Sequence, residues 1–310
     1  MKIAIIGATS QIAKDLIFSF PINTKDSFSL FCRNPELLFS WAQNKKLGLQ
    51  YLIEPYTEFN FHRDFDVVIN FVGAGDPART QKMGSDIIKI TEHYDNMALE
   101  YLKNNKHTKY IFLSSGAVYG GNYQEPITEN TAAIIDINNL KITDSYTIAK
   151  MYAEAKHRLM FDFSIIDVRV FNYFSHTQDL SSRFLITDIV RAIKNKKVFK
   201  TSKDNIYRDF ISPLDFYNLI QAIIDFKSIN TALDCYTKSP ISKFDLLSQL
   251  KSNFGLKYEI EKSDSLINAT GSKTFYYSTN KAARKLGYIP SRSSLESVIS
   301  ELGLCLIDNQ

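Results

Sequence analysis

Residues 2–13 read KIAIIGATSQIA, a short apolar run followed at once by a turn of small residues. Residues 2–6 predict a buried strand, and the apolar residues after the turn recur at helical spacing. The free backbone N–H groups of such a helix N-terminus favour an anion, and Gly7 permits the tight turn. Ser10 and Ala13 stand where dinucleotide-phosphate turns often carry glycine. The stretch therefore indicates a dinucleotide site with an incomplete glycine pattern.

Strands and helices continue to alternate along the first half of the chain. Further strands are predicted at 27–32, 66–72, 110–113 and 165–171, and helices at 85–104 and 145–160. Strands that alternate with helices form parallel βαβ crossovers. We therefore predict an α/β fold, with a Rossmann-type doubly wound parallel sheet over residues 1–171. A smaller mixed α/β substrate lobe is expected over residues 172–310, with interleaved boundaries and with helices at 183–195, 213–226, 242–253 and 293–302.

The composition excludes several classes of protein. The chain has 310 residues, of which 45% are hydrophobic, as in ordinary globular proteins. No apolar run approaches the roughly 18 residues of a membrane span, and the N-terminal run is too short for a signal peptide. A formal net charge of +4 does not indicate nucleic-acid binding. Cys32, Cys235 and Cys305 lack metal-ligand spacing, so we expect no metal and a cytoplasmic location.

The end of the second predicted strand bears on the choice of dinucleotide. An acidic residue there binds the ribose 2′-hydroxyl of NAD, whereas an arginine accommodates the 2′-phosphate of NADP. This chain has Cys32, Arg33 and Asn34 at that place and no acid. We interpret Arg33 as a 2′-phosphate contact and predict NADP(H). The alternatives are a surface arginine in a turn, and NAD as the cofactor.

A Tyr and a Lys four residues apart lie on one face of a helix, where the cation, together with a positive nicotinamide ring, favours the phenolate. Such a tyrosine has a pKa below its usual value of about 10 and can shuttle a proton near neutral pH. The spacing alone has little weight, because it occurs at Tyr146/Lys150, Tyr152/Lys156, Tyr258/Lys262 and Tyr277/Lys281.

A series of motifs stands in one order along the chain. They are Ser114-Ser115 before Val118-Tyr119-Gly120, Pro126-Ile127-Thr128-Glu129, Tyr146 to Lys150, Arg169-Val170-Phe171-Asn172, Arg208-Asp209-Phe210-Ile211, Leu286-Gly287-Tyr288-Ile289-Pro290 and Ser294-Leu295-Glu296. This ordered set resembles the extended short-chain dehydrogenase/reductases, in their nucleotide-sugar epimerase/dehydratase branch. Only the Tyr146 register is followed by the family's glutamate, Glu154. The resemblance therefore selects Tyr146, and Tyr152 is expected to be a packing residue.

The resemblance implies roles for these residues. Ser115 holds the substrate oxygen, Tyr146 is the acid/base, and Lys150 tunes Tyr146 and holds the nicotinamide ribose. The expected cofactor-binding residues come from the phosphate turn, the second strand end, the segment after the 66–72 strand, the catalytic helix and the 165–171 strand: Gly7, Thr9, Ser10, Gln11, Ile12, Arg33, Asn34, Phe71, Val72, Gly73, Tyr146, Lys150 and Phe171.

On the substrate side, the resemblance assigns Asn172 and Arg208 to the diphosphate of a sugar nucleotide. The alternative for Arg208 is a salt bridge with Asp209 or Asp215. The family often has a second phosphate arginine, but residues 258–281 of this chain hold only lysines as cations, including Lys262 and Lys273. The sequence therefore shows only part of the expected phosphate site: Asn172 and Arg208 are present, and the second arginine is not.

The reaction is narrowed by Gly116 and Ala117. Dehydratases of this branch carry an Asp-Glu pair at that place, so elimination lacks its acid and base. Our leading hypothesis is an NADPH-dependent reductase of a nucleotide-linked keto (deoxy)sugar. A 4-epimerase with tightly bound NAD is second, and a non-catalytic NADP-binding sensor is third. The resemblance also implies a homodimer through the helices at 85–104 and 145–160.

Overall fold

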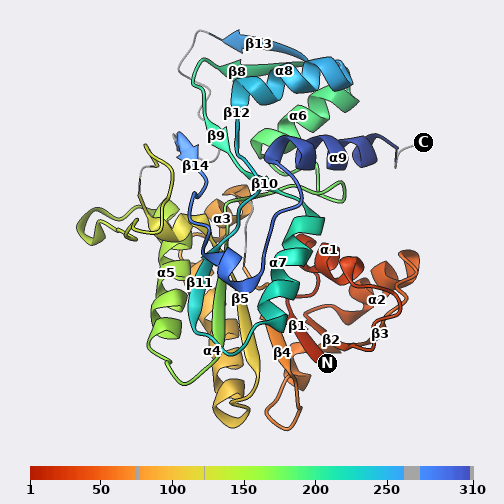
Figure 1. Cartoon of the computed structure of the whole chain (residues 1–310), viewed down its shortest axis with the longest axis vertical. Coiled ribbons are helices and arrows are strands. Elements are labelled where there is room, and N and C mark those ends of the chain that lie inside the picture. Colours follow the sequence, from red (N-terminus) through yellow and green to blue (C-terminus); the bar gives the residue numbers. More distant parts are fainter. Residues whose placement is uncertain (74–76, 122, 262–272, 308–310) are drawn as a thin grey trace.

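In the computed structural model, the residues described are 1–73, 77–121, 123–261 and 273–307. The main sheet is parallel and has seven strands in the order β11-β6-β5-β4-β1-β2-β3 (Figure 1). Its strands are β1 (Lys2–Ile6), β2 (Ser27–Cys32), β3 (Gln50–Pro55), β4 (Val67–Asn70), β5 (Lys109–Ser115), β6 (Ile165–Val170) and β11 (Thr231–Asp234). The strand order reverses between β1 and β4, which is where doubly wound sheets bind ligands.

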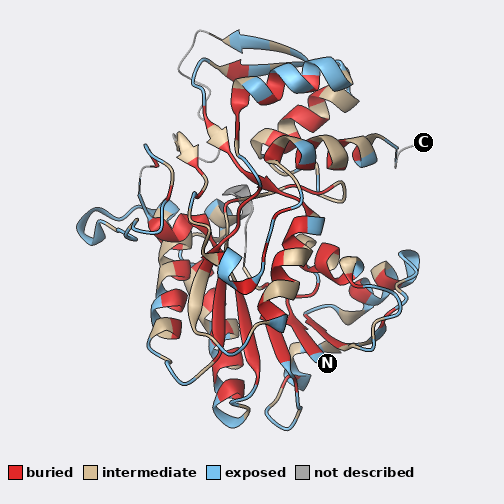
Figure 2. Cartoon of the chain, viewed as in Figure 1, coloured by how far each residue is buried: buried red, intermediate tan, exposed pale blue. Residues whose placement is uncertain are grey.

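Side chains alternate between the two faces of this sheet, as the period of a strand requires. In β1, Ile3 and Ile5 pack in one core and Ala4 and Ile6 in the other. The first core is covered by α1 (Gln11–Ser19) and α7 (Pro213–Asp225), and the second by α4 (Asp86–Asn104) and α5 (Ser145–Arg158). Figure 2 shows the central strands buried between these layers. Buried β1, with apolar residues on both faces, is what a two-sided parallel sheet requires.

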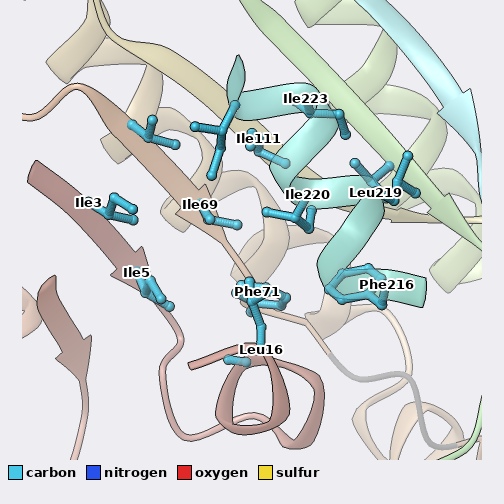
Figure 3. Close-up of a cluster of buried hydrophobic side chains, with 14 of the residues drawn as sticks. Ile3, Ile5, Leu16, Ile69, Phe71, Ile111, Phe216, Leu219, Ile220 and Ile223 are labelled. Carbon is cyan, nitrogen blue, oxygen red and sulfur yellow. The ribbon is translucent and has the colours of Figure 1, made fainter. Parts of the chain in front are cut away.

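Helix α7 belongs to this first layer, although it lies far along the chain. Figure 3 shows Ile220 of α7 beside Ile69 of β4, and Phe216 of α7 beside Phe71, which follows β4. Strand β11 likewise extends the sheet, pairing with β6. Both elements come from beyond residue 171, so parts of the chain after this residue pack with the first lobe, as the expected interleaving implies. The domain boundary between residues 171 and 172 stays a prediction.

The predicted strands and helices are present, with ends shifted by a few residues. In the first lobe, strand β3 and the helices α2 (Pro35–Asn44) and α3 (Pro77–Met83) were missed. Pro35 suggests a turn in the sequence, but it occupies the first helical turn, where a missing N–H has no cost. Strand β3 alternates weakly because it is a half-exposed edge strand.

The second lobe packs α6 (Leu185–Lys194), α8 (Lys243–Phe254) and α9 (Ser294–Ile307) around Phe174. Its short strands are β7 (Asn172–Tyr173) with β10 (Phe210–Ile211), β8 (Val198–Ser202) with β13 (Lys257–Glu261), and β9 (Tyr207–Arg208) between β12 (Ile241–Ser242) and β14 (Phe275–Tyr276). The remaining elements are α3 (Pro77–Met83) and the 3₁₀ turns Tyr56–Glu58, Gly116–Tyr119, Ile137–Asn139, Ile142–Asp144 and Ala282–Leu286. Among the described residues, none of the helices combines the length and apolarity of a membrane span.

Candidate active site

The turn between β1 and α1 fits the phosphates of a dinucleotide. Gly7 has φ +80°, and a Cβ at this position would lie 2.9 Å from the backbone nitrogen of Val72. Ser10 begins the helix as its cap, because its Oγ accepts a hydrogen bond from the Ala13 N–H at 3.2 Å. Thr9 is exposed, and Gln11 and Ile12 are half-buried. The turn thus combines a glycine that no other residue could replace with an exposed helix N-terminus.

The segment after β4 joins this turn to the catalytic helix. The Asn70 side chain holds it, accepting a hydrogen bond from the Val72 N–H at 2.9 Å. A Cβ on Gly73 would lie 3.5 Å from Lys150 Nζ. Phe71 is buried in the first core, so this predicted cofactor residue can offer only its backbone. Val72 and Gly73 are half-buried and are placed to contact a cofactor.

Three catalytic candidates come together where β5 meets α5. Ser115 ends β5, and its Oγ accepts a hydrogen bond from the Ala117 N–H at 3.2 Å. Burial raises the pKa of Tyr146, and a hydrogen bond with Ser115 opposes that shift. Lys150 is only 3% exposed, and its Nζ lies 5.9 Å from the centre of the Tyr146 ring. The three residues therefore share one buried corner at the carboxyl end of the sheet.

In the protein without its cofactor, burial decides the direction of the Tyr146 pKa shift. The Lys150 ammonium donates to the carbonyl of Leu113 at 2.7 Å, and burial lowers its pKa to about 8 although Asp95 and Glu154 oppose the shift. The pKa of Tyr146 is raised rather than lowered, because desolvation of the phenolate outweighs its hydrogen bond with Ser115. The lowered Tyr146 pKa was expected from Lys150 together with a positive nicotinamide ring, and for the protein with its cofactor it stays a prediction.

The motif glutamate has a structural role. Glu154 is buried, accepts a hydrogen bond from Ser114 Oγ at 2.5 Å, and forms an ion pair with Arg169 at 2.6 Å. Arg169 also donates to the hydroxyl of Tyr119, which in turn donates to Asp234 of β11 at 2.9 Å. This network ties α5 to β5, β6 and β11, and so fixes the catalytic helix against the strand that carries Ser115.

Arg208 lies in the second lobe as a buried cation. It is 4% exposed, and its Nη1 donates to the backbone carbonyls of Tyr207 and Lys273 at 2.8 and 2.9 Å. Its Nη2 is buried without a hydrogen-bond partner among the described residues. Burial lowers the pKa of Arg208 to about 10. An unsatisfied buried guanidinium of this kind fits a ligand anion.

The alternative role of Arg208 as an interlobe salt bridge is wrong. Asp209 instead accepts hydrogen bonds from the hydroxyl and the backbone N–H of Thr237. Asp215 accepts from the hydroxyl of Ser291 at 2.7 Å. Within the described ranges, no carboxylate contributes to the charge environment of Arg208.

Lys273 provides a second cation beside Arg208. Burial, followed by the nearby Arg208 charge, lowers the pKa of Lys273 to about 8. Its Nζ lies 4.4 Å from the ring centre of Tyr276 and 4.7 Å from that of Tyr123. Arg208 and Lys273 therefore form a cation pair, and among the described residues no carboxylate contributes to the pKa shift of either. Lys262, the other lysine considered for this role, lies outside the described residues.

Asn172 and Phe171 lie between this cation pair and the sheet. The Asn172 side chain donates to the backbone carbonyl of Tyr276 at 3.1 Å. Phe171 is buried, its ring centre is 5.3 Å from that of Tyr276, and a Cβ on Gly116 would overlap it. Phe171, predicted to bind the cofactor, therefore forms an aromatic wall behind the Ser115 loop in this structure.

Tyr276 is the site residue that the sequence analysis missed. Its hydroxyl lies 3.4 Å from Ser115 Oγ, and its ring lies under the Arg208 guanidinium at 5.8 Å. The motif order did not include this region, because the two residues of β14 are too short a strand to recognise. The one available signal was the aromatic run Phe275-Tyr276-Tyr277, two residues after Lys273.

Arg33 and Asn34 are exposed at the end of β2. Asn34 precedes α2, and its side chain makes no capping hydrogen bond. Tyr56 is their neighbour: burial raises its pKa, while the Arg33 charge and a hydrogen bond from the Gly7 backbone act in the opposite direction. Arg33 is therefore close to the Tyr56 phenol, which itself contacts the phosphate turn at Gly7.

Tyr152 is not the packing residue that was expected. Its side chain is 43% exposed, and its hydroxyl donates to Glu92 of α4 at 3.1 Å. It lies on the outer face of α5, away from the buried corner that holds Tyr146. The homodimer through α4 and α5 stays a prediction.

Comparisons with known proteins agree with this geometry. Residues 56–232 match the model of the NAD dependent epimerase/dehydratase family. A comparison with curated protein sequences gave no significant match. Solved structures with the same fold include the UDP-glucuronic acid 4-epimerase from Bacillus cereus, in complex with UDP-glucuronic acid and NAD (19% identity, all of both chains covered, TM-score 0.80).

Two further structures cover different activities. The UDP-glucose 4-epimerase from Thermotoga maritima, with UDP-glucose, has 14% identity, all of both chains covered and a TM-score of 0.78. The dTDP-glucose 4,6-dehydratase from Bacillus anthracis, in complex with NAD, has 14% identity, with all of this chain and 97% of that chain covered and a TM-score of 0.75. The fold is thus common to epimerases and a dehydratase, and the reaction has to be argued from the site.

Proposed function

Because the chain belongs to the NAD dependent epimerase/dehydratase family, we propose that it interconverts the 4-epimers of a nucleoside-diphosphate sugar with NAD. The observation that carries this proposal is the cation pair of buried Arg208 and half-buried Lys273, connected through Tyr276 to the corner of Ser115 and Tyr146. A diphosphate at the cations would direct the attached sugar toward the two hydroxyls. The named 4-epimerases of similar structure support the choice of reaction.

The residues of the corner divide the chemistry between them. When bound, the nicotinamide supplies reversible hydride transfer to and from carbon. Tyr146 takes the proton of the sugar hydroxyl as the carbon is oxidised and returns it when the carbon is reduced. Ser115 donates a hydrogen bond to the same sugar oxygen. The buried Lys150 ammonium adds positive charge that favours the Tyr146 phenolate. Since the hydride is returned, the sugar is neither oxidised nor reduced overall.

A dehydratase reaction has no support in the site. Elimination of water needs an acid and a base beside the oxidised carbon, and Gly116 and Ala117 supply neither. The Gly116 position is also closed to a larger side chain, because Phe171 fills the space beside it. The similarity to a 4,6-dehydratase is therefore a similarity of fold.

A ketoreductase that consumes NADPH is the second candidate, and Arg33 favours it. An exposed arginine at the end of β2, with no acid beside it in the sequence, suits a 2′-phosphate. The same residue can also stack or pair elsewhere on a dinucleotide, so it does not override the support for an epimerase. The two candidates differ in what happens to the cofactor, which makes them easy to separate.

The test uses the purified full-length protein. Its cofactor is released by denaturation and identified as NAD or NADP. The protein is then incubated with UDP-glucose, UDP-glucuronic acid or UDP-N-acetylglucosamine, and the products are read by proton NMR. A 4-epimer without net change in the cofactor is expected. Steady oxidation of added NADPH by a nucleotide-linked 4-keto sugar would replace the epimerase with the reductase, and turnover of neither would favour a non-catalytic sensor.

A further inference from the structure

Tyr276 connects the hydroxyl of Ser115 with the cation pair Arg208 and Lys273. Its phenolic oxygen lies 3.4 Å from Ser115 Oγ, and its ring faces Lys273 at 4.4 Å and Arg208 at 5.8 Å. Its backbone carbonyl accepts a hydrogen bond from Asn172. One residue of β14 therefore touches the catalytic corner and each of the three groups assigned to the diphosphate.

The Tyr276 ring is held firmly in this orientation. It is 8% exposed and meets Tyr123 edge to face at 5.0 Å and Phe171 at 5.3 Å. Tyr123 is itself fixed, because its hydroxyl donates to the Gly116 carbonyl at 2.7 Å. The phenol is thus directed at the Ser115 loop by packing from several elements.

The contact between Ser115 and Tyr276 limits where the Ser115 hydroxyl can donate its proton. A serine hydroxyl has one proton to donate and two lone pairs to accept with. One lone pair of Ser115 Oγ accepts from the Ala117 N–H at 3.2 Å. If the Tyr276 phenol donates to the second, the Ser115 proton has to be donated elsewhere, and Tyr146 is the neighbour whose phenolate it stabilises.

Tyr276 is suited to be the donor in this pair. Burial raises the pKa of Tyr276, and its hydrogen bond with Ser115, the Arg208 charge and the Ala117 backbone oppose that shift without reversing it, so the phenol keeps its proton at neutral pH. The charged and titratable groups that face it are Tyr123, Tyr146, Arg208 and Lys273, and no carboxylate among the described residues contributes to the pKa shift of either cation.

We infer that Tyr276 is a positioning residue, which donates to Ser115 and thereby fixes the Ser115 hydroxyl as a hydrogen-bond donor toward Tyr146 and the substrate oxygen. The inference deepens the proposed function and rests on it for the identity of the substrate. It predicts that Tyr276 affects the ionisation of Tyr146 through the Ser115 hydroxyl, and not through a bond of its own to Tyr146. A residue that only supports packing would leave that ionisation unchanged.

The first test needs no substrate. The ultraviolet absorbance of phenolate is titrated in the wild type and in Tyr276→Phe, each compared with the same protein carrying Tyr146→Phe, so that the difference reports Tyr146 alone. The apparent pKa of Tyr146 is expected to rise in Tyr276→Phe. The matched control is Tyr277→Phe, the next residue, whose ring lies beside Phe275 at 6.4 Å and which has no role in the corner. An unchanged Tyr146 titration in Tyr276→Phe would overturn the inference.

A double-variant comparison separates positioning from general damage. Ser115→Ala is expected to raise the Tyr146 pKa as well, and adding Tyr276→Phe to it should have no further effect, because the two act through one hydroxyl. Additive effects would mean that Tyr276 acts by another route.

The second test uses the epimerisation assay. Loss of one hydrogen bond to Ser115 is expected to lower kcat about tenfold with KM unchanged, and to move the acidic limb of the kcat profile to higher pH. A rise in KM with kcat intact would overturn the positioning role. If the wild type turns over no sugar, the proposed function fails, whereas the titration still decides the role of Tyr276.

Discussion

Substituting Arg208 by methionine is expected to stabilise the ligand-free protein while weakening substrate binding. Arg208 is 4% exposed, and its charge has no acid beside it among the described residues. Methionine keeps much of the apolar stem and removes the charge. The two effects have opposite signs, so they distinguish a binding cation from a structural one.

The expected magnitude follows from the pKa of Arg208, which burial lowers from the ordinary arginine range to about 10. At 1.36 kcal/mol for each pH unit, burying this charge costs roughly 3 kcal/mol. Loss of the hydrogen bonds to the Tyr207 and Lys273 carbonyls offsets roughly 2 kcal/mol of that gain. The free energy of unfolding should therefore rise by about 1 kcal/mol in Arg208→Met.

The pH dependence has a definite sign. A base whose pKa is lower in the folded protein destabilises it fully below the folded value, here about 10, and the destabilisation is relieved as the pH rises above it. At neutral pH the difference between wild type and variant is therefore independent of pH. Urea unfolding of both proteins, without nucleotide, measures it.

Binding should change in the other direction. A charge-assisted hydrogen bond to a phosphate contributes about 1.5–3 kcal/mol, so KM for the nucleotide sugar should rise at least tenfold. The control is Arg183→Met, an exposed arginine whose side chain is 69% accessible and pairs with Asp188. A variant at Arg208 that is less stable than the control and has an unchanged KM would refute the reasoning.

Three further predictions concern Tyr146, Arg33 and His157, a buried residue of α5 that contacts Asp95 and Asp167. Tyr146→Phe should lower turnover by about 100-fold or more while the dinucleotide still binds, and Tyr152→Phe should leave both unchanged; appreciable activity in the first would mean that another group carries the proton. Arg33→Ala should weaken NADPH more than NADH in fluorescence titrations, and equal losses would make Arg33 a bystander. Burial alone would lower the pKa of His157, but the Asp167 and Asp95 carboxylates raise it to about 9. Protonated His157 therefore stabilises the fold fully below its ordinary pKa, and this stabilisation is lost as the pH rises through 9. Between those two pH values, the free energy of unfolding should fall with pH in the wild type and not in His157→Gln.

The sequence was a good guide where one local pattern decides the structure. The two-sided apolar strand β1 and the small-residue turn at Gly7 depend on neighbouring residues only, and both are present as predicted. The family order placed Ser115, Tyr146 and Lys150 together, and the structure brings them into one corner.

The sequence was a poor guide where distant segments meet. Tyr276 reaches Ser115 across 161 positions of the chain, and nothing near either residue indicates that contact. The raised pKa of Tyr146 depends on burial by other segments, which spacing along one helix does not reveal. Arg208 is similar: two aspartates stand near it in the sequence, but each is hydrogen-bonded to other groups.

The contributions of β11 and α7 to the first lobe have a consequence for how the protein is made. The face of the sheet that carries Ile3 and Ile5 is covered by α7, and the sheet edge at β6 is closed by β11, which ends at Asp234. During synthesis, this apolar face and this strand edge therefore stay uncovered until about three quarters of the chain has left the ribosome. The first lobe is complete only after much of the second has been translated, so the two lobes mature together rather than one after the other.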